Sequence, residues 1–167
     1  MSRVTLVLGG ARSGKSRFAE SLAKTALRKT YIATAEAFDE EMRQRIAHHE
    51  AQRGDGWVTI EAPLDLVAAL GACRDGFVLI DCVTVWLNNL MFHECDVTAE
   101  VAVLCAALKE TKLDVVLVSN EVGLGIVPDN ALARRFRDAQ GLANQRIAEV
   151  ATEVYFIAAG LPLALKK

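Results

Sequence analysis

The sequence predicts an α/β protein in which a mostly parallel sheet is flanked by helices on both faces. Short runs rich in β-branched residues alternate with longer amphipathic runs along the chain. Several short runs are apolar throughout, as strands are when helices cover both faces of a sheet. The 167 residues include 52% hydrophobic and 24% charged residues, the balance of a globular protein, and one domain over 1–167 is expected.

Strands and helices are expected in alternation. The expected strands cover 4–10, 30–35, 57–62, 77–83, 115–120 and 154–160. The expected helices cover 15–28, 36–52, 64–73, 84–92, 98–111 and 130–151. The final run LPLALK is expected as one more strand at the sheet edge, and the prolines fall at element boundaries.

Charge and cysteine content exclude several classes of partner. The net charge of −2 gives no bulk attraction to nucleic acid or anionic lipid, so a phosphate-bearing substrate needs a local site. No apolar run approaches the roughly 18 residues of a membrane span, and no leader pattern is seen, so a cytoplasmic protein is expected. The four cysteines are too widely spaced for paired zinc ligands. The two in apolar runs, Cys82 and Cys105, are expected to be buried free thiols.

The strongest signal is GGARSGKS, directly after the first expected strand. Gly9, Gly14, Lys15 and Ser16 have the spacing of a P-loop, between a strand and an amphipathic helix. Lys15 would reach the β and γ phosphates, and the Ser16 hydroxyl would ligate Mg²⁺. Backbone N–H groups would surround the phosphates along Gly9, Gly10, Ala11, Arg12, Ser13, Gly14, Lys15 and Ser16. The alternative is a chance match in a glycine-rich turn; with the flanking elements, the motif predicts a P-loop NTPase-type fold.

The run FVLID supplies a second candidate metal ligand, Asp81, after four apolar residues. A carboxylate at the end of a buried strand is costly unless it meets a cation or hydrogen-bond donors. Asp81 could instead cap the helix that begins near Val83, and both roles could hold at once.

Two motifs of switch GTPases are missing from their expected places. The Asp81 strand continues as Asp-Cys-Val-Thr instead of DxxG, and no N-K-x-D follows the strand 115–120. An enzyme that transfers part of a nucleotide is therefore favoured over a switch.

The run RQRIAHHEAQR places two adjacent histidines in a charged helix. Phe38, Met42 and Ile46 define an apolar stripe, with His49 about 20° from its middle and His48 about 120° away. His49 is therefore expected at the edge of the core and His48 in polar surroundings. From its position on this charged helix alone, His48 is expected to be a solvated side chain.

Four segments together resemble the bifunctional adenosylcobinamide kinase / adenosylcobinamide-phosphate guanylyltransferases of cobalamin biosynthesis. They are LVLGGARSGKSRFAE, YIATAEAFDEEMRQRIAHHEAQR, LIDCVTVWLNNLMF and VVLVSNEVGLGIVPDNALARRFRDAQGLANQRIAE. The match covers nearly the whole chain in the same order. A P-loop alone is unspecific, but its combination with A-T-A-E, R-I-x-H-H and N-E-V-G-x-G-I-V-P is highly specific.

The resemblance implies two reactions. Adenosylcobinamide is phosphorylated with ATP or GTP, and GMP from GTP then passes through a guanylyl-histidine to adenosylcobinamide-phosphate. It implies catalytic roles for Lys15 and for His48, the first histidine of the pair. It implies Mg²⁺ held by Ser16 and Asp81, although some relatives have Glu in place of Asp81, and it implies a homotrimer. Beyond the P-loop it implies nucleotide contacts from Ala33, Thr34, Ala35, His49, Glu50, Ala51, Gln52, Glu61 and Asp81.

Two other functions remain open from the residues: a P-loop kinase of a small metabolite with His48 a bystander, and a regulatory nucleotide-binding module without chemistry. Asn120 and Glu121 are candidates for substrate or metal contact, or belong to a tight surface loop. Arg134, Arg135 and Arg137 form either a solvated face or a phosphate clamp.

Overall fold

The computed structural model describes residues 2–36 and 40–167. Within the helix that follows residue 39, the backbone is described throughout, but the side chains of 42, 45, 48–50 and 52 are outside the described set. The predictions for Phe38 and for the side chains of Met42, His48 and His49 therefore lie outside the described residues.

The described residues form one seven-stranded sheet in the order β3-β2-β4-β5-β1-β6-β7. The strands are β1 (Val4–Gly9), β2 (Lys29–Ala33), β3 (Trp57–Glu61), β4 (Phe77–Asp81), β5 (Asp114–Asn120), β6 (Glu153–Ala158) and β7 (Leu161–Lys166). All neighbouring pairs are parallel except β6 and β7, which are antiparallel. The mostly parallel sheet is confirmed, as are the predicted strands, including the last edge strand.

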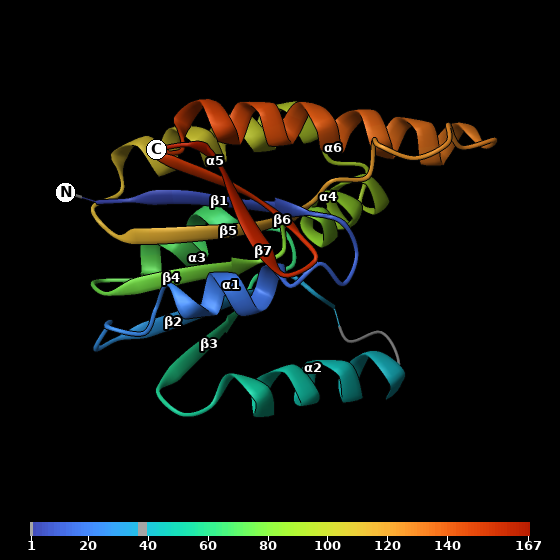
Figure 1. The fold of residues 1–167 in the computed structure, drawn as a ribbon. Helices are drawn as coiled ribbons and strands as arrows, with labels where there is room; N and C mark the ends of the chain where they lie inside the picture. Colours follow the sequence, from blue (N-terminus) through green and yellow to red (C-terminus); the bar gives the residue numbers. More distant parts are fainter. Residues whose placement is uncertain (1, 37–39) are drawn as a thin grey trace.

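Helices cover both faces of this sheet, as predicted (Figure 1). They are α1 (Lys15–Ser21), α2 (Glu40–Arg53), α3 (Leu66–Ala72), α4 (Val83–Phe92), α5 (Val97–Glu110) and α6 (Ala131–Val150). One core cluster joins α3, α4, α5 and α6 to one face through residues such as Leu6 and Ile80. The other joins α1 to the opposite face through alternate residues such as Val7 and Leu79.

Helix α2 lies apart from these layers, beside the β3 edge of the sheet (Figure 1). Ile46 is the member of the predicted apolar stripe whose side chain is described, and it is only half-buried. It belongs to neither core cluster. Ile46 therefore lies at the sheet margin, because α2 runs beside the edge of the sheet instead of across a face.

Helix α1 is shorter than the predicted 15–28, ending at Ser21. The Ser21 hydroxyl donates to the carbonyl of Phe18 at 2.6 Å. The N–H groups of Leu22 and Ala23 then bond to carbonyls three residues earlier, which tightens the chain into turns. The remaining predicted helices match the structure closely, and Asp65, Asp96 and Asn130 cap α3, α5 and α6.

The four cysteines are free thiols, which confirms the expectation for Cys82 and Cys105, although Cys105 is buried and Cys82 only half-buried. None of the helices formed by the described residues combines the length and hydrophobicity needed to cross a bilayer.

A buried polar network fastens α6 to the end of β5. Ser119 Oγ donates to Asn144 Oδ1 at 2.6 Å, and Gln140 Nε2 donates to both of these oxygens at 2.9 and 3.0 Å. Asn144 Nδ2 donates in turn to the carbonyl of Asn120 at 3.1 Å. Ser119 and Gln140 are fully buried. Because buried polar groups are costly without partners, these bonds fix where the end of β5 lies.

The Asn144→Ala variant is expected to lose about 3 kcal/mol of unfolding free energy, because the Ser119 hydroxyl and the Asn120 carbonyl lose a partner in the interior. Urea unfolding measures this loss. Gln145→Ala, at an exposed position on the same helix, is the matched control and should stay within about 0.5 kcal/mol of wild type. Equal unfolding midpoints for the two variants would contradict the assigned role of the network.

Candidate active site

The sheet brings the P-loop and Asp81 to the same edge. Strand β5 lies between β4 and β1, with Asp81 paired to Val118 and Gly9 paired to Asn120. Two interstrand steps separate Gly9 from Asp81 laterally by about 10 Å. This is the carboxyl edge of the strands, where open α/β sheets bind their ligands.

Both motif glycines of the P-loop are required by their surroundings. A Cβ on Gly9 would lie 2.6 Å from the carbonyl oxygen of Ile157 and 2.7 Å from Ser13 Oγ. Gly14 has a φ of +99° and lies against Gly160, whose N–H donates to the carbonyl of Ser13 at 2.8 Å. The turn between β6 and β7 therefore supports the loop from behind.

Two polar groups of the P-loop are available to an anion. Ser13 Oγ is buried and has no hydrogen-bond partner within the described part of the chain. Lys15 is 8% exposed, and its Nζ donates to the Gly10 carbonyl at 2.5 Å. Burial lowers the pKa of Lys15, while nearby Cys82 and Asp81 act in the opposite direction. A bound phosphate would give both groups charged oxygens as partners.

The Asp81 carboxylate accepts a hydrogen bond from the hydroxyl of Tyr31 at 2.9 Å. Burial, together with the charge of Asp81, raises the pKa of Tyr31, so this hydroxyl stays protonated and donates.

The alternative role for Asp81 as a helix cap is wrong. The cap of α4 is Cys82, whose sulfur accepts from the N–H of Val85 at 3.5 Å. Burial raises the pKa of the Cys82 thiol to about 11, so it is neutral near pH 7.

Thr34 fixes the chain that follows Asp81. Its hydroxyl accepts from the N–H of Cys82 at 2.8 Å and donates to the Cys82 carbonyl at 2.9 Å. Asn89 in turn donates to the carbonyls of Thr34 and Pro63. The A-T-A segment thus holds the β2 and β4 ends together, with Ala33 buried and Ala35 half-buried. Its predicted nucleotide contacts stay a prediction.

The helix that carries the histidine pair is attached to the site through its last residue. The guanidinium carbon of Arg53 lies 3.3 Å from the centroid of the Tyr31 ring, a cation–π contact. Tyr31 therefore links Asp81 to the C-terminal end of α2. Ala51 is exposed on this helix, whereas the side chains of His48, His49, Glu50 and Gln52 lie outside the described residues.

The remaining candidate residues also lie at the carboxyl edge. Glu61 is exposed at the end of β3 and pairs with Ala33, four strands from the P-loop strand. Asn120 donates its N–H to Thr84 Oγ1 at 2.8 Å. The N–H of Glu121 donates to the Gly9 carbonyl at 3.0 Å, and its carboxylate accepts from the N–H of Gly123 at 2.6 Å. Glu61 lies far from the P-loop strand, whereas Glu121 adjoins it.

The three arginines Arg134, Arg135 and Arg137 have different surroundings, and a phosphate clamp formed by them stays a prediction. Arg134 donates to the carbonyls of Pro128 and Asp129 at 2.9 and 2.8 Å. Arg135 is exposed, and Arg137 lies 3.5 Å from the carboxylate of Asp138. Arg134 therefore fastens the segment before α6.

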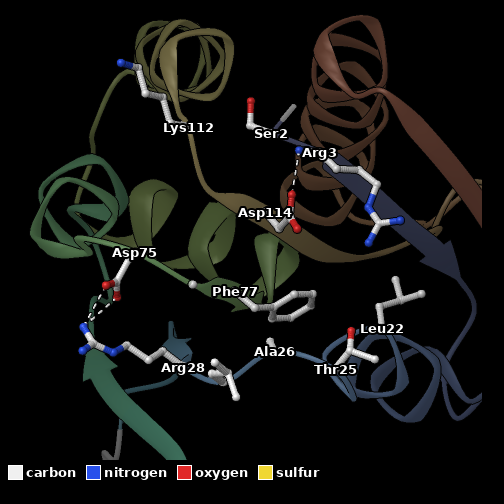
Figure 2. A pocket seen from close by; sticks show the side chains of 12 residues that line it. Ser2, Arg3, Leu22, Thr25, Ala26, Arg28, Asp75, Phe77, Lys112 and Asp114 are labelled. Carbon is white, nitrogen blue, oxygen red and sulfur yellow. Dashed lines mark hydrogen bonds and ion pairs between the residues drawn. The ribbon is translucent and has the colours of Figure 1, made fainter.

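The large cavity in Figure 2, about 840 Å³, lies at the opposite edge of the sheet. It is lined where β1, β4 and β5 begin, by residues such as Arg3, Phe77 and Asp114. Its arginines already have acidic partners: Arg28 pairs with Asp75 at 2.8 Å, and Arg3 Nη1 lies 3.8 Å from the carboxylate of Glu153. Because its lining residues lie where these strands begin, the cavity is separate from the P-loop, which follows the end of β1.

Sequence reasoning missed Tyr31, Arg53 and the network around Asn144. The run YIATA reads only as a strand, and nothing in it marks a hydroxyl aimed at Asp81. Gln140 and Asn144 did carry a signal, because they stand four residues apart among the buried positions Ala143 and Ile147 of α6.

A P-loop with a buried lysine, facing a carboxylate across one intervening strand, defines an α/β protein that binds nucleoside triphosphates. The fold agrees with a solved ATPase of a bacterial type III secretion system. The TM-score is 0.57 at 10% identity, over 97% of this chain and 56% of that chain, which supports the fold alone.

The chain belongs to the cobinamide kinase / cobinamide phosphate guanyltransferase family, whose model matches residues 5–165. It is 48% identical, over 96% of both chains, to the bifunctional adenosylcobalamin biosynthesis protein CobP of Pseudomonas aeruginosa. It is 42% identical to the bifunctional adenosylcobalamin biosynthesis protein CobU of Salmonella typhimurium, over 96% of this chain and 98% of that one. The resemblance drawn from the sequence motifs is confirmed.

Gly9→Ala is expected to weaken binding of GTP at least about tenfold, because the new methyl group collides with the Ile157 carbonyl and displaces the loop. Isothermal titration calorimetry measures the affinity. Gly10→Ala is the matched control, since a Cβ there has no atom within 4 Å. Equal affinity of the two variants would contradict the assigned packing of the P-loop.

Tyr31→Phe keeps the ring beneath Arg53 but removes the donor to Asp81. The unfolding free energy should fall by about 1.5–3 kcal/mol, the contribution of a hydrogen bond to a charged group. Tyr155→Phe, whose ring packs on Phe18, controls for loss of a tyrosine hydroxyl. Chemical denaturation measures the unfolding free energy of both variants. If Tyr31→Phe loses no more unfolding free energy than the control, the role of this hydrogen bond is refuted.

Proposed function

We propose that this chain phosphorylates adenosylcobinamide and then transfers GMP from GTP to adenosylcobinamide-phosphate, with residues 1–167 acting as one catalytic domain. The observation that carries the proposal is the alignment of the P-loop strand end at Gly9 with Asp81 at one sheet edge, in a chain of this family. The link from Asp81 through Tyr31 to Arg53 supports a functional connection to the helix of His48.

In the first reaction, the hydroxyl oxygen of adenosylcobinamide attacks the γ-phosphorus of ATP or GTP. The bond from the γ-phosphorus to the bridging oxygen breaks, the hydroxyl proton is released, and a nucleoside diphosphate leaves. Catalysis of such a transfer is mostly positioning and charge stabilisation. The P-loop amides, Ser13 Oγ and Lys15 supply these for the γ-phosphate.

Mg²⁺ fits the donor set at this edge, because the Ser16 hydroxyl and the Asp81 carboxylate are hard oxygen ligands. No group of three or more histidine, cysteine or acidic side chains able to hold a metal occurs among the described residues. Mg²⁺ commonly binds through one or two protein oxygens together with substrate phosphates, as this pair would allow. When bound, the ion neutralises charge on the phosphate oxygens.

In the second reaction, a neutral ring nitrogen of His48 attacks the α-phosphorus of GTP. The bond to the pyrophosphate oxygen breaks, which leaves a guanylyl-histidine. A phosphate oxygen of adenosylcobinamide-phosphate then attacks the same phosphorus, the phosphorus–nitrogen bond breaks, and adenosylcobinamide-GDP forms. Covalent catalysis here divides one hard displacement into two easier ones.

We assign the remaining nucleotide contacts to Ala33, Thr34, Ala35, His49, Glu50, Ala51, Gln52 and Glu61. Ala33 and Glu61 are paired at the same sheet edge as Asp81, which supports their inclusion. We further propose a homotrimer that works in the cytoplasm, a reducing compartment that suits the four free cysteines.

The labelling test uses purified protein, Mg²⁺ and GTP labelled with ³²P at the α or the γ position, without corrinoid. Acid-labile, base-stable label is expected on the protein from the α position only. It should be lost in His48→Ala and kept in His49→Ala. Label that survives His48→Ala would put the nucleophile elsewhere, and no label at all would leave a kinase at most.

Self-guanylylation should also depend on pH. His48 attacks only as the neutral imidazole, so the rate should fall as the pH drops below about 6.5, the ordinary pKa of histidine. Initial rates of α-³²P incorporation between pH 5 and pH 8 measure this, with GTP binding as the control for loss of affinity. A rate that stays flat down to pH 5 would count against histidine as the nucleophile.

A further inference from the structure

Large aliphatic side chains are exposed together on the segment between β5 and α6. Leu124 is 82% and Ile126 98% exposed, and Val122, Val127 and the nearby Leu132 are exposed as well. Single exposed aliphatic residues are ordinary, but such a run marks a binding surface. We refer to residues 122–127 as the apolar loop.

Both ends of the apolar loop are fastened. At its start, the carboxylate of Glu121 accepts from the N–H of Gly123 at 2.6 Å. Beyond its end, the guanidinium of Arg134 donates to the carbonyls of Pro128 and Asp129. These contacts restrain the backbone at both ends of the apolar loop, which lowers the entropic cost of binding a ligand there.

The apolar loop starts beside the P-loop. The N–H of Glu121 donates to the carbonyl of Gly9 at 3.0 Å. From Glu121 to Val127 the chain can extend no further than about 20 Å. Figure 1 shows this segment extending past the carboxyl edge of the sheet, toward the start of α6.

We propose that the apolar loop is the docking surface for the corrin macrocycle of cobinamide, an inference that rests on the proposed function. The acceptor hydroxyl must reach the γ-phosphate at the P-loop, and the macrocycle is attached to that hydroxyl by a short arm. The macrocycle must therefore lie close to the carboxyl edge. Its rim carries methyl groups between amide side chains, and Leu124 and Ile126 supply an apolar surface for those methyl groups.

A second copy of the chain fits this loop less well. A stable protein interface needs roughly 20–30 residues on each side. The apolar loop has six residues and projects from the fold instead of forming a broad face. A small, projecting aliphatic surface of this kind suits a single small-molecule ligand.

The test is equilibrium dialysis of adenosylcobinamide against the full chain with Mg²⁺ and a non-hydrolysable GTP analogue, followed by corrinoid absorbance. The double variant Leu124→Ser/Ile126→Ser should raise the Kd for the corrinoid about tenfold or more. Leu27→Ser is the matched control, because Leu27 is 100% exposed and lines the cavity at the opposite edge. It should leave the Kd unchanged, and GTP binding should be unchanged in both variants.

An unchanged corrinoid Kd in the double variant overturns the proposal. So does a Kd that weakens only together with a drop in mass measured by light scattering, which would make the loop an interface between copies. If the wild-type chain retains no corrinoid, the proposed function itself fails, and the docking surface fails with it. If wild type and the double variant retain the corrinoid equally, the docking surface is refuted and the proposed function is not.

Discussion

Parallel pairing of β5 with β1 on one side and β4 on the other is the constraint on which the site depends. In this register Gly9, Asn120 and Asp81 end at one edge of the sheet, although 111 residues separate Gly9 from Asn120 in the sequence. The anion-binding loop and the carboxylate follow directly from those strand ends. Gly9 must remain a glycine, because the neighbouring β6 carbonyl occupies the space of a side chain.

Many polar side chains near this edge hold backbone in place instead of contacting a ligand. Thr34 bonds the chain after Asp81, Thr84 bonds the start of the turn at Asn120, and Asn144 bonds the Asn120 carbonyl. Each bond satisfies a buried group that would otherwise be costly. The side chains of Ser13 and Lys15 remain available to bind phosphate. The hydroxyl of Tyr31 orients the Asp81 carboxylate.

The fold class could be predicted because strand and helix periods differ and the strands are apolar on both faces. The strand order could not, since no residue in the sequence marks β5 as the strand between β1 and β4. Asp81 could be predicted as a site residue because a carboxylate at the end of a buried strand is costly unless it meets a cation or hydrogen-bond donors. Tyr31 could not, because its hydroxyl meets Asp81 only once β2 pairs with β4. The choice of His48 over His49 came from family resemblance, with the helical wheel in agreement.

We propose that the same P-loop binds the triphosphate in both transfers. Lys15→Ala tests it when phosphorylation of adenosylcobinamide and guanylylation of His48 are measured separately on one preparation, with circular dichroism to confirm the fold. Because Lys15 is the buried cation of the loop, both rates should fall roughly 10²–10³-fold. Guanylylation at the wild-type rate, with phosphorylation lost, would put the GTP of the second reaction in another site and contradict this account.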